Sequence, residues 1–452
     1  MTRKFATGGA PWLGPAAALG LAGGAALLVA ARPEAVGALF LAVGVAAALA
    51  AAWLWPGTAA VLWLFAVALT PDMWLAAFLG AGAGMAVVAG LKFAGIALVL
   101  LALSRHGARF DPFSPAWAFV AMFAWTAACG LHPALEMGES LRSLAGSVAP
   151  FLWFFLRWPA AMARAVRCAA AWLAPASVLL GAGLAVWGVH PLFVDQGGLR
   201  LQGAGHPAFL AAFAMVGAYA ALLEGLGAGR LRWVLPLGLN LGILALSGAR
   251  APAAIAGTVL LAAVLSGRVP AALGAVRPAL LAAAGLLALA AGVFAGEAAG
   301  LRLFQLLEGE AGHLSGRDEI WPIFAAAWDA APVLGWGVGT GKVLVPLDSL
   351  TARLLGTNAA HNEYLRIGVE GGYLGLTLLI SLFLAWSVWQ VRARRGVEGR
   401  IVLLVLIGFA VHSYTDNTLI ATTSLVLFAW LAAVLAAAGD GTDGRERSRT
   451  LS

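Results

Sequence analysis

The chain has 452 residues, of which 62% are hydrophobic and only 11% are charged, and its mean hydropathy is +0.90. A soluble domain carries about 25% charged residues, so this composition excludes an ordinary globular domain. The net charge is +7, but the basic residues are scattered between apolar segments, which argues against a nucleic-acid-binding surface. The sequence therefore predicts an all-α polytopic integral membrane protein.

The apolar segments can be taken in chain order as candidate membrane spans. They are 11–31, 35–55, 57–70, 84–104, 116–131, 141–157, 168–188, 207–224, 232–247, 251–266, 278–296, 367–391, 401–415 and 419–437. Several are shorter than the roughly 17 to 25 residues of a comfortable span, so about 12 spans are as compatible with the pattern as 14. The first segment ends without a clear cleavage site, and we interpret it as a retained helix rather than a signal peptide.

The distribution of Lys and Arg orients these spans. Cytoplasmic loops are enriched in both residue types. When the N-terminus is placed in the cytoplasm, the loops that become cytoplasmic contain more Lys and Arg than the loops on the other side. Both termini are then cytoplasmic. We divide the chain into N-terminal membrane helices (1–296), an outer loop with short helices (297–364), C-terminal membrane helices (365–438) and a cytoplasmic tail (439–452).

The long outer loop contains three local patterns. Residues 301–307 form an amphipathic run that could lie at the membrane interface. A capping-box pattern at 315–318 predicts a helix through Trp328, kinked at Pro322. The glycine-rich stretch 335–342 lacks the first glycine and the Ser or Thr of a phosphate-binding loop, so we interpret it as an irregular turn.

Single arginines stand at the outer ends of successive elements, on a membrane face where positive charge is normally depleted. They are Arg142, Arg200, Arg250, Arg317 and Arg366. Guanidinium groups bind phosphate oxygens bidentately and keep their charge when desolvated, so a pocket made of them would suit a lipid-linked phosphate or diphosphate. The alternative is that each arginine snorkels or pairs with an acid such as Glu139, Asp195 or Glu370.

A polar cluster opens the span that follows the loop. His361 stands at the predicted helix start, where a neutral imidazole could accept a proton near neutral pH. Glu363 and Arg366, and Arg366 and Glu370, are spaced so that each pair shares one helix face. Asp416 follows a later span and could orient His361 or an arginine. A capping or interfacial histidine is the alternative to a catalytic one.

These residues resemble the O-antigen ligase and O-antigen polymerase superfamily of bacterial inner membranes. The motifs are Ser247-Gly248-Ala249-Arg250, Ser315-Gly316-Arg317-x-x-x-Trp321, Pro332-x-x-Gly335-x-Gly337, His361-Asn362-x-Tyr364-Leu365 and Glu370-Gly371-x-x-x-Gly375-Leu376. The resemblance is specific from about residue 200 to residue 376. Before that it depends on hydropathy alone.

The resemblance implies a GT-C-like, inverting glycosyltransferase that acts at the periplasmic face of the inner membrane. It would move a glycan from undecaprenyl diphosphate to an acceptor, among membrane lipids, with no nucleotide, metal or other cofactor. His361 matches the family's catalytic histidine, and Arg250 and Arg317 match arginines expected to bind the diphosphate. Arg200 and Arg142 join that set only by their predicted position, with Asn362, Arg366, Glu370 and Asp416 as supporting residues.

Three acceptors are open within the superfamily: lipid A-core for a ligase, a second lipid-linked repeat for a polymerase, and a protein serine for an oligosaccharyltransferase. We favour the ligase, because the chain has one compact outer loop and no added C-terminal segment. A transporter or flippase for an anionic lipid-linked substrate is the alternative from another class. Such a protein should carry cations along a path through the membrane, yet Lys92 is the one charged residue well inside a predicted span.

Overall fold

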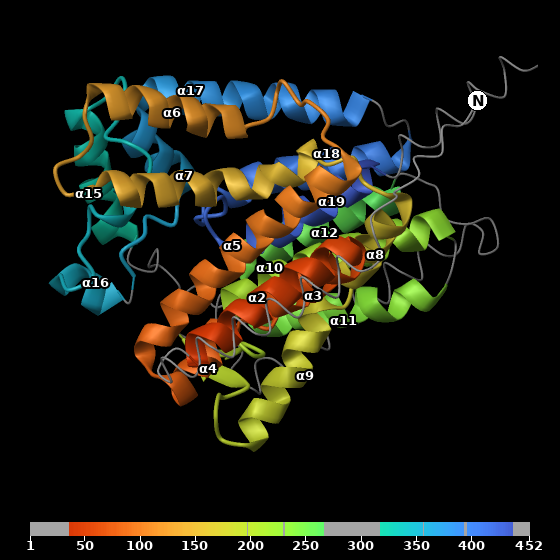
Figure 1. Ribbon diagram of the computed structural model, residues 1–452. Helices are drawn as coiled ribbons and strands as arrows, with labels where there is room; N and C mark the ends of the chain where they lie inside the picture. The colour runs from red at the N-terminus through yellow and green to blue at the C-terminus, as the bar shows by residue number, and fades with distance from the viewer. Residues whose placement is uncertain are drawn as a thin grey trace, which may run out of the picture. The chain divides into compact units, whose positions relative to one another are not determined.

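The computed structural model describes residues 36–196, 198–228, 231–265, 317–355, 357–392 and 396–436 (Figure 1). The chain divides into two units, Met1–Pro56 and Gly57–Ser452. The described part of the first unit is essentially one apolar helix, α2 (Val36–Leu54). The predicted spans 11–31 and 278–296, and the amphipathic run 301–307, lie outside the described residues.

The remaining elements are almost all helical. The helices are α3 (Pro56–Ala68), α4 (Pro71–Leu79), α5 (Ala81–His106), α6 (Ala116–Cys129), α7 (Met137–Leu152), α8 (Ala160–Ala170), α9 (Leu173–Val186), α10 (Pro207–Ala228), α11 (Val234–Ser247), α12 (Arg250–Leu265), α15 (Arg317–Ala330), α16 (Leu350–Leu355), α17 (Glu363–Arg392), α18 (Val397–His412) and α19 (Thr422–Ala436). Short 3₁₀ helices are η2 (Trp153–Phe155), η3 (Leu231–Trp233) and η5 (Thr340–Lys342). Each predicted span among the described residues therefore coincides with a helix.

Three of these helices are long and apolar enough to cross a membrane: Gly84–His106 in α5, Pro207–Gly225 in α10, and α17. Two bent pairs raise the number to five if each pair is one broken span. These are α3 with α4, bent by 69°, and α8 with α9, bent by 50°. The segment predicted as one span at 168–188 is thus the second arm of a bent pair. The chain is a helical membrane protein, and the count of 12 to 14 spans stays a prediction.

Among the described residues, one short hairpin departs from the helical fold. Residues 193–195 (β1) and 199–201 (β2) form a two-stranded antiparallel hairpin before α10, with Val194 opposite Arg200. A hairpin this short carries almost no hydropathy signal, which is why the sequence pattern did not predict it.

The core of the second unit is built around α10. In the most apolar stretch of α10, 72% of residues are buried, against 22% in that of α5 and 28% in that of α17. Helix α10 packs against α8, α9, α11, α12 and α19. Aromatic rings fill the space between α7, η2, α17 and α19, where Phe151, Phe154 and Trp386 surround Phe428. Inside the bundle, contacts between aromatic rings add about 0.5–1.5 kcal/mol each beyond the burial of their area.

Helix α15 packs on the start of α17. Ile320, Phe324, Val345 and Val369 form a buried apolar cluster between them. The indole of Trp321 also donates a hydrogen bond to the carbonyl of Ala360 at 2.8 Å. The helix predicted at 317–328 is therefore confirmed, and it holds the chain in place just before α17 begins.

Helix α17 is broken at Gly372, which has φ 62° and ψ −166°. Residues 332–337, which overlap the start of the irregular turn predicted at 335–342, bond to the polar groups that the break leaves free. The amides of Trp336 and Gly337 donate to the carbonyls of Val369 and Glu370, and the carbonyl of Pro332 accepts from the amide of Tyr373. These hydrogen bonds hold the first two turns of α17 against residues 332–337.

The break predicts a specific cost for a side chain at Gly372. A Cβ atom there would stand 2.3 Å from the carbonyl oxygen of Val333, in a backbone region that only glycine occupies readily. Gly372→Ala should lower the free energy of unfolding by about 1–3 kcal/mol or more. Thermal unfolding of the purified protein in detergent measures this.

Gly242→Ala is the matched control, because Gly242 lies within α11 and a Cβ there meets nothing within 4 Å. That variant should be as stable as the parent or up to about 1 kcal/mol more stable. Equal unfolding midpoints for the two variants would contradict the role given to the break.

Candidate active site

His361 stands immediately before the first turn of α17. The side-chain oxygen of Asn362 accepts a hydrogen bond from the amide of Leu365 at 3.1 Å, which caps the helix start. His361 itself has φ 48°, in the left-handed region that non-glycine residues rarely adopt. Strained backbone of this kind is held only where the surrounding contacts impose it, and it gathers at functional sites.

Both nitrogens of the His361 imidazole lie within hydrogen-bond distance of another side chain. Nδ1 lies 3.2 Å from Oδ1 of Asp416, and Nε2 lies 3.1 Å from the hydroxyl of Thr357. The two side chains of the His361–Asp416 pair are 38% and 34% exposed, so a substrate can reach them. With Asp416 ionised, Nδ1 carries the proton and Nε2 is left as the acceptor.

Asp416 is kept ionised by its neighbours. Burial by itself raises the pKa of this carboxyl, but the hydrogen bond with His361 and the nearby His412 more than offset it, and the net pKa lies below the usual value. Nε2 of His412 stands 3.8 Å from Oδ2 of Asp416. Asp416 is therefore an anion at neutral pH and able to orient His361.

His206 approaches this pair from the loop before α10. Its imidazole is in electrostatic range of Arg200, Asp416 and His361. Burial, followed by the charge of Arg200, lowers the pKa of His206, so its ring is neutral at neutral pH. The structure thus brings Arg200, His206, His361 and Asp416 into one region from four separate segments.

The segments that carry His361 and Asp416 are joined by several hydrogen bonds. The amide of Glu363 donates to the carbonyl of Ser413 at 2.8 Å, and Oε1 of Glu363 accepts from the amide of Leu419 at 2.6 Å. The hydroxyl of Tyr364 donates to the carbonyl of Ala410 at 2.8 Å. These contacts fix the start of α17 against the loop after α18, and with it the geometry of the pair.

Arg366 lies inside the protein between two carboxylates. Its Nε is 2.5 Å from Oε2 of Glu363 and its Nη1 is 2.7 Å from Oε2 of Glu370. All three side chains are at most 5% exposed. The pairing predicted from the spacing is confirmed, and these contacts favour a supporting role for Arg366 and Glu370 over direct binding of substrate.

Arg200 and Arg250 both lie at the corner between α11 and α12. Arg200 is buried on β2, and its Nε donates to the carbonyl of Ser247 at 2.8 Å. Gly248, with φ 62°, ends α11, and Arg250 begins α12 with an exposed side chain. Arg200 therefore links this corner to the region of His206 and His361.

The other two predicted arginines differ in what surrounds them. Arg142 lies on α7 with a side chain that is 63% exposed and paired with Glu139 at 2.7 Å. This is the acid pairing that the sequence left open. Arg317 is the first residue of α15, and its side chain lies outside the described part of the chain.

Thr357 and His412 touch this site, and the sequence reasoning gave neither a function. Lys92 had no assigned partner, and its Nζ donates to the carbonyl of Ile420, in the loop that carries Asp416, at 2.8 Å. None of these residues lies in a recognisable motif, so only the fold shows their proximity. A charged residue within an apolar span was the one available signal, and it pointed to Lys92.

Comparison with known proteins identifies part of the chain. Residues 235–380 match the family model described as O-antigen ligase. This stretch is similar to the O-antigen ligase family. It contains Arg250, Arg317, His361 and the Glu363–Arg366–Glu370 triad, so the resemblance seen in the sequence is confirmed. No curated protein matches the chain at a significant level.

The buried triad makes a testable prediction about stability. Arg366→Met would leave the carboxylates of Glu363 and Glu370 buried without a cation, which typically costs about 3–5 kcal/mol. Arg142→Met is the control, since an exposed ion pair contributes about 0–1 kcal/mol. Unfolding of both variants in detergent should show a large loss only for Arg366→Met. Similar losses would show that the triad does not stabilise the protein.

Proposed function

We propose that this protein is an O-antigen ligase, which transfers a polysaccharide from undecaprenyl diphosphate to lipid A-core with inversion at the anomeric carbon. It would lie in the bacterial inner membrane with both termini in the cytoplasm and the His361 site facing the periplasm. The observation that carries this proposal is the contact between Nδ1 of His361, which lies in the stretch that matches the O-antigen ligase family model, and Asp416, which follows that stretch.

His361 is the proposed general base. When Asp416 accepts from Nδ1, Nε2 is the acceptor nitrogen, and the hydroxyl of Thr357 donates to it in this tautomer. A hydroxyl of the acceptor sugar in the same position would lose its proton to Nε2 as its oxygen attacks the anomeric carbon of the donor. General-base catalysis of this type contributes about 10²- to 10⁴-fold to the rate.

Arginines are proposed to hold the diphosphate leaving group. As the glycosidic bond breaks, negative charge grows on the diphosphate, and fixed cationic donors stabilise it by about 10²- to 10³-fold each. Arg250 is the first choice, because it is exposed at the corner that Arg200 links to the site, and Arg317 is the second. The donor brings its own leaving group, so the proposed reaction needs neither nucleotide nor metal.

Reconstitution with purified components tests this function. The protein, the lipid-linked donor and lipid A-core are combined in vesicles with no nucleotide and with a chelator present. We expect glycan to appear on lipid A-core. Failure of transfer under these conditions, with the protein folded and the donor intact, would contradict the proposal.

The His361–Asp416 pair predicts two variants of different severity. His361→Ala should abolish transfer while donor binding is largely kept, because the base is lost and the diphosphate site is not. Asp416→Asn should lower kcat by about 10²-fold, because the amide can no longer favour the Nδ1 proton. Turnover and donor binding of the purified variants measure this. Full activity of His361→Ala would remove the histidine from the mechanism.

A cell that lacks the protein separates the ligase from the polymerase. A missing ligase should leave long glycan on undecaprenyl diphosphate and bare lipid A-core, because chains are built but not transferred. A missing polymerase should leave single repeats on the core. Electrophoresis of the lipopolysaccharide, with the lipid-linked pool analysed in parallel, distinguishes these outcomes, and the second pattern would contradict the ligase assignment.

A further inference from the structure

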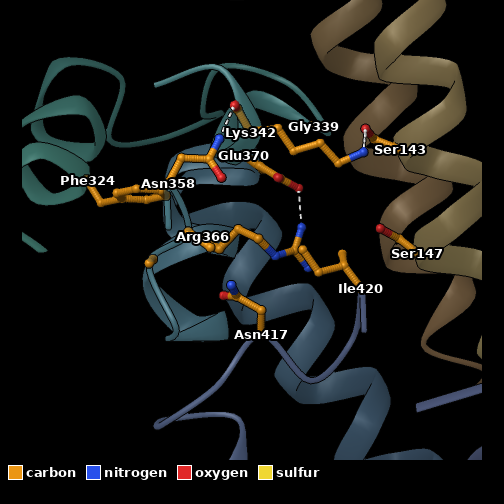
Figure 2. A pocket seen from close by; sticks show the side chains of 13 residues that line it. Ser143, Ser147, Phe324, Gly339, Lys342, Asn358, Arg366, Glu370, Asn417 and Ile420 are labelled. Atoms are coloured by element: carbon orange, nitrogen blue, oxygen red, sulfur yellow. Dashed lines mark hydrogen bonds and ion pairs between the residues drawn. The ribbon is translucent and has the colours of Figure 1, made fainter. Parts of the chain in front are cut away.

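A cavity is lined by chain neighbours of His361 and Asp416 and is not used by the proposed reaction steps. Its wall includes Ser143 and Ser147 of α7, Lys342, residues 358–360, and Arg366 (Figure 2). Asn358, Ala359 and Ala360 directly precede His361, and Asn417, also on the wall, directly follows Asp416. Some residues that line the cavity are therefore direct chain neighbours of His361 and Asp416.

The cavity contains buried polar groups without partners. Among the described residues, Ser147 Oγ, Arg366 Nη2 and Asn417 Oδ1 have no hydrogen-bond partner. Ser147 is fully buried, and the Arg366 side chain is only 5% exposed. Figure 2 shows the Ser147 hydroxyl and the Arg366 guanidinium facing the same space. A buried polar group left unpaired is costly, so three around one cavity indicate that something polar occupies it.

The charges around the cavity do not call for an anion. Arg366 already bridges Glu363 and Glu370, and Lys342 already pairs with Glu139 at 3.2 Å and contacts the hydroxyl of Ser143 at 2.9 Å. A phosphate placed here would also meet the carboxylate of Glu370, which is part of the wall. The positive charge of the wall is thus largely compensated before any ligand arrives.

The remaining groups match hydroxyls instead. The wall offers donors, such as Arg366 Nη2, together with acceptors and groups that do both, such as the serine hydroxyls and the asparagine amides. Sugar hydroxyls both donate and accept, and phosphate oxygens only accept. The cavity offers about 90 Å³, enough for several water molecules or for the hydroxyl-bearing edge of one sugar ring.

We propose that this cavity is a subsite for a sugar residue of the acceptor glycan, bound through its hydroxyl groups by Ser147, Arg366 and Asn417 next to the His361–Asp416 pair. This inference depends on the proposed transferase function. A ring held here would lie beside the base, as the acceptor must, whereas the donor diphosphate would lie on the side of Arg200 and Arg250.

Steady-state kinetics with Ser147→Ala test the subsite, using the reconstituted protein, lipid-linked donor and lipid A-core. Loss of one hydrogen bond to a neutral ligand should raise the KM for lipid A-core about 3- to 10-fold. The donor KM and kcat should stay within about twofold of the parent. Ser147→Val, which also fills part of the space, should raise the acceptor KM further.

Ser387→Ala is the matched control, because Ser387 Oγ is also buried without a partner among the described residues but does not line the cavity. It should leave both KM values unchanged, and unfolding midpoints verify that all variants are folded. An unchanged acceptor KM in Ser147→Ala would show that the cavity holds only water and overturn the proposal. A raised donor KM in Ser147→Ala would also overturn the proposal. Inhibition by inorganic phosphate that competes with lipid A-core, and that is relieved in Ser147→Ala, would overturn it as well.

The two hypotheses fail in different ways. If the parent protein transfers glycan and Ser147→Ala behaves like Ser387→Ala, only the subsite is wrong. If the parent protein transfers nothing, the transferase function is wrong and the subsite is wrong with it.

Discussion

The buried guanidinium of Arg366 is the constraint on which the site depends. Desolvating one cation and two carboxylates is costly, and the cost is recovered only when the geometry of the pairs is good. Glu363 and Glu370 supply that geometry from one turn on either side, at 2.5 and 2.7 Å. Glu363 also accepts the amide of Leu419, so the same carboxylate fixes the loop that carries Asp416. Breaking the triad would therefore loosen the base and its orienting acid together.

The glycine break in α17 complements this arrangement. After Gly372 the helix continues as a long apolar segment, and the short segment before Gly372 carries the triad. The carbonyls freed by the break are taken up by the turn at 335–337, which is itself anchored by α15. Backbone groups in a membrane protein need such partners, because lipid offers no hydrogen bonds. The segment 332–337 thus supports the first turns of α17.

Much of this arrangement could be predicted from the sequence, because hydropathy and helical spacing are local signals. The positions of the apolar helices among the described residues, the helix after Ser315 and the pairing of Arg366 with both glutamates follow from them and are confirmed, whereas the number of spans stays a prediction. The left-handed backbone of His361, the contact with Thr357 and the approach of His206 could not be predicted. The first two are local but leave no signal in hydropathy or helical spacing, and the approach of His206 depends on segments far apart in the chain that meet only after folding. The same holds for Lys92, whose carbonyl partner belongs to a loop near the other end of the chain.

The central claim is that Asp416 sets the tautomer of His361 and leaves Nε2 free to take a proton. ¹⁵N spectra of histidine-labelled protein, recorded at a pH where the ring is neutral and assigned with a His361→Gln variant, report this directly. The account predicts a protonated Nδ1 and an unprotonated Nε2, with the preference lost in Asp416→Asn. A ring protonated on Nε2 in the parent protein would contradict it, because that nitrogen could not act as the base.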